Sequence, residues 1–338
     1  MIETKTKSDL SDIPAKVART PHADAEKIMS TRHKRLGHLF LFFLLAPFSA
    51  GVANAQLSAP VIRGDMGLQA GSQPPPGVYV TGVLYNYDTH TIVDQNGNHF
   101  SRVGIDAYLA AVGVTYVAKK KVLGGNYSAT GIFPLADTAI NSPFAASNTG
   151  TAYSDTYVQP IQLGWHKKRY DAMAWYGLYM PTGRFTDGAS NNTGFGMWSH
   201  EFGGAATFFL NEKKEWHVAI APTYNIQSHI KDTNKKVGNI LSLEGGVGRT
   251  LCSHLCNVGV DYYTQWKVTQ DKFANLPTGF LGKHRYYGLG PEVNGTIPLN
   301  KDTITVFKLA FFHEFGNRSA TLGNSIIMSV TWAKLKHE

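Results

Sequence analysis

The stretch Trp216-His217-Val218-Ala219-Ile220-Ala221-Pro222-Thr223-Tyr224-Asn225-Ile226-Gln227 decides the fold class. Its even-numbered residues are apolar from Trp216 to Ile226, whereas its odd-numbered residues are small or polar. An alternation with a period of two residues predicts a β-strand with one apolar and one polar face. The same split recurs around Val258–Trp266 and Leu241–Gly248, so we expect an all-β protein. Because soluble antiparallel sheets also alternate, the pattern alone does not choose between lipid and a protein core.

The connections between the predicted strands favour a membrane barrel. Tight polar links are expected at Lys119–Lys121, His166–Arg169, Asn211–Glu215, Ser253–Leu255 and Leu299–Asp302. Longer polar loops are expected at Asp88–Arg102, Asp137–Asp155, Thr182–Trp198, Ser228–Gly238 and Gln270–His284, with a shorter one at Gly316–Ala320. Short turns alternating with long loops, and an even strand number, are typical of outer-membrane barrels. The sequence therefore predicts a transmembrane antiparallel up-and-down β-barrel of about 12 strands, with both ends on the short-turn side, in the periplasm.

The first part of the chain reads as an export signal. Arg32, Lys34 and Arg35 precede the apolar run Leu36–Phe48, and Ala53-Asn54-Ala55 matches a cleavage site. We interpret residues 29–55 as a secretory signal peptide and residues 1–28 as a non-native upstream leader, with a genuine unusual leader as the alternative. Residues 56–76 then form a pre-barrel segment, and residues 77–338 form the barrel.

Composition excludes other classes of protein. The 338 residues carry 32 Lys and Arg against 24 Asp and Glu, a formal net charge of +8. The basic residues are scattered, which does not support a nucleic-acid partner. After the signal, no apolar run approaches the 18 residues of a membrane helix.

Aromatic residues are expected to form two belts, because Trp and Tyr favour the membrane interface. The outward phase places Trp165, Trp216 and Trp332 near the short turns. It places Tyr157, Tyr224 and Tyr287 near the long loops. Ordinary strand aromatics are the alternative explanation, since strands are enriched in them.

The box Met66-Gly67-Leu68-Gln69-Ala70-Gly71-Ser72-Gln73-Pro74-Pro75-Pro76-Gly77-Val78-Tyr79-Val80, followed by Leu84-Tyr85-Asn86-Tyr87, resembles the opening of the SphA-like proteins. These are also known as the family of the MetA pathway of phenol degradation. The resemblance implies an outer-membrane barrel associated with aromatic-compound degradation that passes hydrophobic molecules. It supplies no set of functional residues.

The prolines in this box mark the entrance to the first strand. Pro74–Pro76 have no backbone donors and favour an extended segment, so they cannot pair centrally in a sheet. The residues before them are expected either to plug the lumen or to hang in the periplasm as a tether, because irregular backbone at membrane depth is tolerated only inside protein or a water-filled cavity.

The inward phase of the strands selects the candidate permeation residues. These are Asp171, Glu201, His217, Glu244, Asp261, Glu292, Lys308 and Glu314. They could favour cations or form a polar gate, as charged rings do in pores. The alternative is a satisfied network that keeps a narrow barrel rigid. Twelve strands allow at most a narrow or partly plugged passage.

Two short motifs are candidate sites. His200-Glu201-Phe202-Gly203 recurs as His313-Glu314-Phe315-Gly316 at the long-loop rim. In a strand each Glu points inward and each His outward, so neither pair forms a metal site. Cys252 and Cys256 flank a tight turn and are expected to form a disulfide in the oxidising periplasm.

No cofactor or metal is expected. Gly245-Gly246-Val247-Gly248 lacks the strand-to-helix context of a nucleotide loop and reads as packing glycine. Ser199 adjoins His200, but neighbours on a strand diverge, and no third group completes a triad.

The sequence thus predicts an outer-membrane channel for small hydrophobic or aromatic permeants. The alternatives are a lipid-modifying hydrolase and a sealed structural or surface-interaction barrel. The expected partners are outer-membrane lipid, lipopolysaccharide, periplasmic chaperones and the barrel-assembly machinery; the sequence leaves the oligomeric state open.

Overall fold

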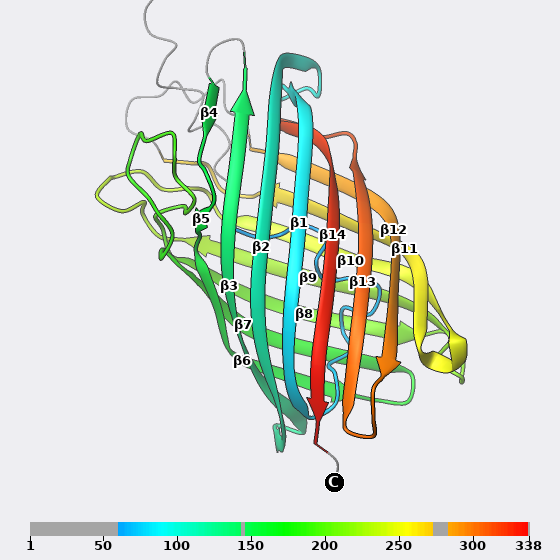
Figure 1. Cartoon of the computed structure of the whole chain (residues 1–338). Helices are drawn as coiled ribbons and strands as arrows, with labels where there is room; N and C mark the ends of the chain where they lie inside the picture. Colours follow the sequence, from blue (N-terminus) through cyan, green and yellow to red (C-terminus); the bar gives the residue numbers. More distant parts are fainter. Residues whose placement is uncertain (1–59, 143–145, 273–282, 337–338) are drawn as a thin grey trace, which may run out of the picture. The chain divides into compact units, whose positions relative to one another are not determined.

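Twelve antiparallel strands close into a barrel (Figure 1). The structure is a computed structural model that describes residues 60–142, 146–272 and 283–336. The barrel strands are β1 Gly77–Val93, β2 His99–Val122, β3 Gly125–Asn141, β6 Thr156–His166, β7 Tyr170–Met180, β8 Ser199–Phe209, β9 Trp216–Gln227, β10 Ile240–Leu251, β11 Cys256–Lys267, β12 Arg285–Pro298, β13 Thr303–Glu314 and β14 Ala320–Leu335. Two short pieces, β4 Ala146–Asn148 and β5 Ala152–Tyr153, pair with β3. The predicted fold class is confirmed.

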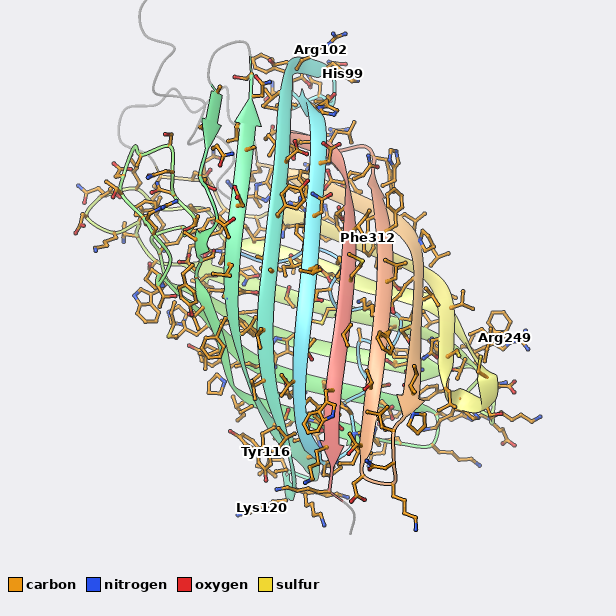
Figure 2. All side chains as sticks on the ribbon, in the orientation of Figure 1. His99, Arg102, Tyr116, Lys120, Arg249 and Phe312 are labelled. Atoms are coloured by element: carbon orange, nitrogen blue, oxygen red, sulfur yellow. The ribbon has the colours of Figure 1, made fainter. Side chains whose placement is uncertain are left out.

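Each strand pairs with its neighbours in sequence, and β1 pairs with β14 to close the ring. Gly77 lies opposite Leu335 in that seam, so the first and last residues of the barrel lie at the same end. That end also carries the turn between β2 and β3, and Figure 2 shows Tyr116 and Lys120 there, with His99 and Arg102 at the opposite end.

The outer surface is apolar, as the strand periodicity requires. On β11, Val258 and Val260 are 44% and 47% exposed, whereas Asp261 and Tyr263, on the opposite face of the strand, are each 1% exposed. Exposed apolar side chains alternating with buried polar ones invert the arrangement of a soluble protein, and they match a wall that faces lipid. Among the described residues, no helix is long and apolar enough to cross a membrane.

The predicted boundaries of the first hairpins are wrong. Strands β1 and β2 continue through most of the expected loop Asp88–Arg102, leaving only residues 94–98 as the connection. Asp94 accepts hydrogen bonds from the backbone N–H groups of Asn96 (2.8 Å) and Asn98 (2.9 Å), and Gly97 has φ +87°. Their polar sequence predicts a loop, but strands that extend beyond the lipid no longer need an apolar face.

The turn expected at Lys119–Lys121 lies further along the chain. All three lysines belong to β2, and the chain reverses at Leu123 and Gly124. Both residues have positive φ, 51° and 78°, which is the geometry of a two-residue hairpin turn. Charge alone therefore misplaced this turn, since exposed lysines suit the end of a strand as well.

Candidate functional site

All eight predicted permeation residues point into the barrel. Seven of them are less than 7% exposed, and the side chain of Lys308 is 14% exposed. Such burial means that these groups do not line an open water-filled pore. Four of them, Glu244, Glu292, Lys308 and Glu314, contact the segment that precedes β1.

This segment, residues 60–76, contacts inward-facing side chains across the barrel. The backbone N–H groups of Gly64 and Met66 donate to the Glu244 carboxylate at 3.0 and 3.2 Å. Further along, Gly71 N–H donates to Thr207 Oγ1 at 2.9 Å. Glu244 lies on β10 and Thr207 on β8, so the contacts span several strands.

Lys308 and Glu292 bind a second part of the segment. Their side chains form an ion pair at 3.0 Å, and Lys308 Nζ also donates to the backbone carbonyl of Asp65 at 2.9 Å. Asn294 Nδ2 donates to Glu292 Oε1 at 2.8 Å. Because both charges are paired and hydrogen-bonded, they hold the segment in place without leaving an uncompensated charge in the interior.

Leu68 anchors the segment in a socket made of glycines. Its side chain is 0% exposed. A Cβ atom added to Gly246, Gly248 or Gly259 would lie 2.9, 3.1 or 2.5 Å from a Leu68 methyl group. These positions are tight on other sides as well, because the same Cβ atoms would meet Asp261 Oδ1 at 2.3 Å, His217 Nε2 at 2.6 Å and Val247 O at 2.3 Å, respectively. This explains the glycine-rich run of β10, which the sequence had indicated as packing glycine.

Near the start of the segment, the Arg63 side chain lies at the long-loop end of the barrel, in a cage formed by one carboxylate and three tyrosine rings. Its guanidinium pairs with Glu314 at 3.3 Å and lies over the ring of Tyr286 with Cζ 4.0 Å from the centroid. The rings of Tyr87 and Tyr263 lie 5.3 and 5.9 Å from the same atom. A guanidinium stays protonated in proteins, so Arg63 is a permanent cation and the counter-charge of Glu314.

Glu201, in the other copy of the His-Glu-Phe-Gly motif, has similar neighbours. Its carboxylate accepts hydrogen bonds from Tyr157 Oη (2.9 Å), Trp175 Nε1 (2.9 Å) and Asn225 Nδ2 (3.2 Å). In both copies the Glu is buried and the His bonds a neighbour on the adjacent strand: His200 contacts Tyr176 Oη at 2.8 Å. The two motifs therefore play the same local role, an inward carboxylate bound by aromatic donors.

Tyr157 was predicted to face outward, which is wrong. The pairing of β6 with β7 shifts between Val158 and Ile161, and Pro160 lies within the shift. A bulge adds one residue and reverses the phase of the strand beyond it. Trp165 and Tyr157 therefore lie on opposite faces, although an even spacing separates them in sequence.

The remaining predicted residues are Asp171, His217 and Asp261, of which Asp171 interacts with Ser72 of the segment and Asp261 with Glu292. Asp171 pairs with His166 at 3.1 Å, near the short-turn end. His217 is 0% exposed and lies beneath Gly248, and Asp261 is 1% exposed beside Gly246. Within the described ranges, no three His, Cys, Asp or Glu side chains gather closely enough to hold a metal ion.

The wall formed by β1, β2 and β3 differs from the carboxylate side. The inward-facing positions of this wall carry no charged residue in the described ranges Tyr79–Thr89 of β1, Ile105–Val117 of β2 and Ser128–Thr138 of β3. Leu109 and Ile132 on this wall are partly exposed, unlike the buried carboxylates. The lumen therefore has an uncharged side that the pre-barrel segment leaves partly uncovered.

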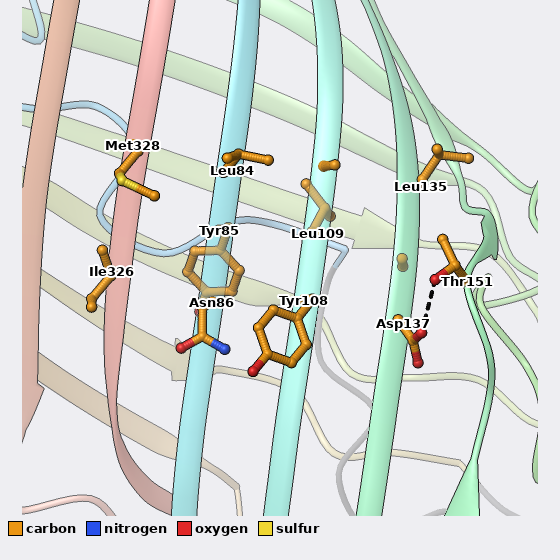
Figure 3. Close-up of a pocket in the computed structure, with 12 residues that line it drawn as sticks. Leu84, Tyr85, Asn86, Tyr108, Leu109, Leu135, Asp137, Thr151, Ile326 and Met328 are labelled. Atoms are coloured by element: carbon orange, nitrogen blue, oxygen red, sulfur yellow. Dashed lines mark hydrogen bonds between the residues drawn. The ribbon is translucent and has the colours of Figure 1, made fainter.

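The same three strands and β14 carry a hollow of about 510 Å³ on their outer face (Figure 3). Leu84, Tyr108, Leu135 and Met328 line it, and a hydrogen bond from Thr151 Oγ1 to Asp137 Oδ2 (2.8 Å) closes its polar edge. Its lining also includes Tyr85 and Leu109, which the strand phase places on the inner side of the same wall.

Cys252 and Cys256 are free thiols in this structure. They flank the turn Ser253–Leu255, and Cys256 pairs with Leu251 at the end of β10. Cys252 is exposed and Cys256 is half-buried, so both can be reached by an oxidant. The disulfide between them stays a prediction.

Sequence reasoning missed Arg63 and Leu68 as the residues that dock the segment. The segment has no periodicity to reveal which side chains are buried. The glycines of β10 and β11 were the available signal, because a run of glycines in a strand often marks close approach of another chain segment.

Comparison with known proteins agrees with this architecture. The chain is similar in fold to the COG4313 outer membrane channel from Pseudomonas putida F1, with a TM-score of 0.64 and 12% identity, over 81% of this chain and 99% of the other. Weaker similarity, with a TM-score of 0.46 and 9% identity, relates it to the transport unit of the autotransporter AIDA-I from Escherichia coli, over 77% and 90% of the two chains. No curated protein matches the sequence.

A family model described as "Putative MetA-pathway of phenol degradation" matches residues 89–330. The match covers most of the chain and nearly the whole barrel, so it does not depend on the proline-rich box from which the resemblance was first drawn. The chain therefore belongs to the family of the MetA pathway of phenol degradation.

Proposed function

We propose that this protein is an outer-membrane channel that lets small hydrophobic or aromatic compounds pass by diffusion. The observation that carries the proposal is the division of the lumen: the pre-barrel segment binds the carboxylate side, whereas the wall of β1–β3 is uncharged and partly exposed. A path along an uncharged wall favours uncharged solutes, because they do not have to pass desolvated charges.

The proposed orientation puts the short turns and both chain ends in the periplasm. The described parts of the longer connections, residues 146–155, 181–198, 228–239, 268–272 and 283–284, then lie outside, next to lipopolysaccharide. Trp216 and Trp332, 46% and 42% exposed near the short-turn end, fit the inner interface of the bilayer. Reaching this location requires export, chaperones and the barrel-assembly machinery, as proposed from the sequence.

The proposed segment boundaries are consistent with the same topology. The proposed signal peptide, residues 29–55, and the leader before it lie outside the described residues. The contacts of Arg63 and Leu68 support a plug rather than a periplasmic tether for residues 56–76, of which the structure describes those from Pro60 onwards.

Uptake into liposomes tests the function directly. We expect phenol-like solutes to enter vesicles containing the purified protein faster than empty vesicles, and small sugars to enter more slowly than the phenols. If neither solute enters faster than into empty vesicles, the barrel is sealed and the proposal fails. Release of fatty acid from the vesicle lipid would favour the hydrolase instead.

The path itself can be tested at Leu109. Leu109→Glu places a charge on the uncharged wall, and aromatic uptake is expected to fall by about tenfold, the effect of a barrier raised by 1.4 kcal/mol. Leu109→Met keeps the volume and the apolar character and serves as the matched control. Equal uptake by both variants would exclude a path along this wall.

A further inference from the structure

The barrel builds the cage around Glu314 without help from the pre-barrel segment. The Glu314 carboxylate accepts hydrogen bonds from Tyr87 Oη (2.9 Å), Tyr263 Oη (2.9 Å), Asn317 Nδ2 (3.0 Å) and Gly323 N–H (3.0 Å). All four donors belong to barrel strands or their loops. The barrel itself therefore positions the carboxylate, and in the docked state, where Glu314 is 1% exposed, its charge needs a counter-charge.

The cage is shaped for a flat cation. The ring of Tyr286 lies 4.0 Å from Arg63 Cζ, within the range of cation–π stacking, and Tyr87 and Tyr263 flank the same group. A guanidinium stacks on aromatic faces and bonds a carboxylate in its plane, whereas an ammonium is a compact, strongly hydrated charge. The Arg63 side chain remains 13% exposed, so one edge of the cage opens to the lumen.

We propose that this cage is a receptor for guanidinium compounds, which Arg63 fills in this structure and which a free guanidinium compound can fill in its place. Arg63 acts as a tethered ligand, and its high local concentration gives it the advantage over a solute. The surroundings of Glu201 provide a contrast. Its donors are also aromatic, but among the described residues it forms no ion pair, so we assign no cation to it.

Direct binding to purified full-length protein tests the proposal, with methylguanidinium as the probe and calorimetry as the readout. We expect Arg63→Ala to bind one methylguanidinium per barrel and the wild type to bind at least tenfold more weakly. Glu314→Gln or Tyr286→Leu, each combined with Arg63→Ala, should abolish binding. Glu201→Gln in the same background should leave it unchanged. Two independent cage variants are used because either one alone could disturb folding, which heat-dependent gel mobility reports.

Several results would overturn the proposal. Absence of binding to folded Arg63→Ala is one. Binding that survives loss of both Glu314 and Tyr286 is another, because the site would then lie elsewhere. Equal affinity for tetramethylammonium and methylguanidinium would remove the argument for a flat cation. Since binding is measured without transport, the outcome is independent of whether the barrel conducts phenols.

Discussion

Leu68→Ala should release the pre-barrel segment. Leu68 is fully buried and contacts the glycines of β10 and β11 only when the segment is docked. The packing free energy lost on truncation therefore destabilises the docked state relative to the undocked state. Truncation of a buried Leu to Ala costs roughly 2–5 kcal/mol, and a socket built of rigid strand backbone cannot collapse to fill the space. If Leu68→Ala weakens docking by about 3 kcal/mol, the fraction of undocked segment should rise by about 100-fold.

The assay uses the position of Arg63. Trypsin cannot reach the peptide bond after Arg63 while the side chain lies in the cage, whereas an undocked segment exposes it. We expect peptides that begin at Gly64 to form up to about 100-fold faster from Leu68→Ala, because cleavage of a rapidly opening segment follows its open population. The matched control is Leu84→Ala, since Leu84 is 53% exposed on the outer face of β1.

Cleavage after Arg63 at the wild-type rate in Leu68→Ala would refute the reasoning. It would mean that the segment is held by its polar contacts alone, or that it is not docked in the membrane. Equal acceleration in Leu84→Ala would point to general loosening of the barrel rather than to the socket.

Four further predictions concern stability, charge and the two cysteines. Tyr87→Phe leaves Glu314 with one donor fewer and should lower the unfolding free energy by about 1–3 kcal/mol in denaturant titrations, whereas Tyr116→Phe on the outer face should change it little. Val260→Arg, in the middle of the exposed apolar band, should cost about 2–4 kcal/mol in lipid vesicles, and His313→Arg at the rim about 0–1 kcal/mol; equal costs would contradict a lipid-facing wall. Burial lowers the pKa of His284 well below its ordinary value, and the nearby positive charges of Lys267 and Arg63 lower it further. Below about pH 6.5 the unfolded chain therefore binds a proton at His284 that the folded chain does not, and the melting temperature should fall. The variant His284→Gln should show a weaker dependence of the melting temperature on pH. A disulfide between Cys252 and Cys256 should lower the mass of the unreduced protein by two hydrogens in mass spectrometry. Because the loop that it closes is short, it should raise the unfolding free energy by less than about 3 kcal/mol. Two alkylated thiols in unreduced protein isolated from the outer membrane would contradict the disulfide.

The sequence predicts the barrel because the period-two pattern is a local property of each strand. Val258 to Trp266 alternates whatever the rest of the chain does, so the inward positions of Asp261 and Glu314 could be assigned correctly. The prediction failed where a local rule was interrupted. At Pro160 a bulge reverses the phase and turns Tyr157 inward, and beyond the lipid the polar ends of β1 and β2 look like loop.

The docking of the segment could not be predicted for a different reason. Its partners lie on strands far apart in the sequence: Arg63 meets residues from β1, β11, β12 and β13. Which inward residues come together in a barrel depends on the stagger of every strand between them, and no single strand encodes it. The carboxylates were recognisable as interior residues, but their common ligand was not.

The seam between β1 and β14 joins the two ends of the barrel, and the cage draws on both of them. Tyr87 on β1 donates to Glu314 on β13, and its hydroxyl lies 2.6 Å from Thr321 on β14. A slip of one residue in the seam would turn Tyr87 outward, since successive residues of a strand face opposite sides. Arg63 can therefore bind fully only to a barrel that has closed in the correct register. The segment, which is synthesised before the barrel strands, is in this way the last to reach its place, and its docking reports that assembly has finished correctly.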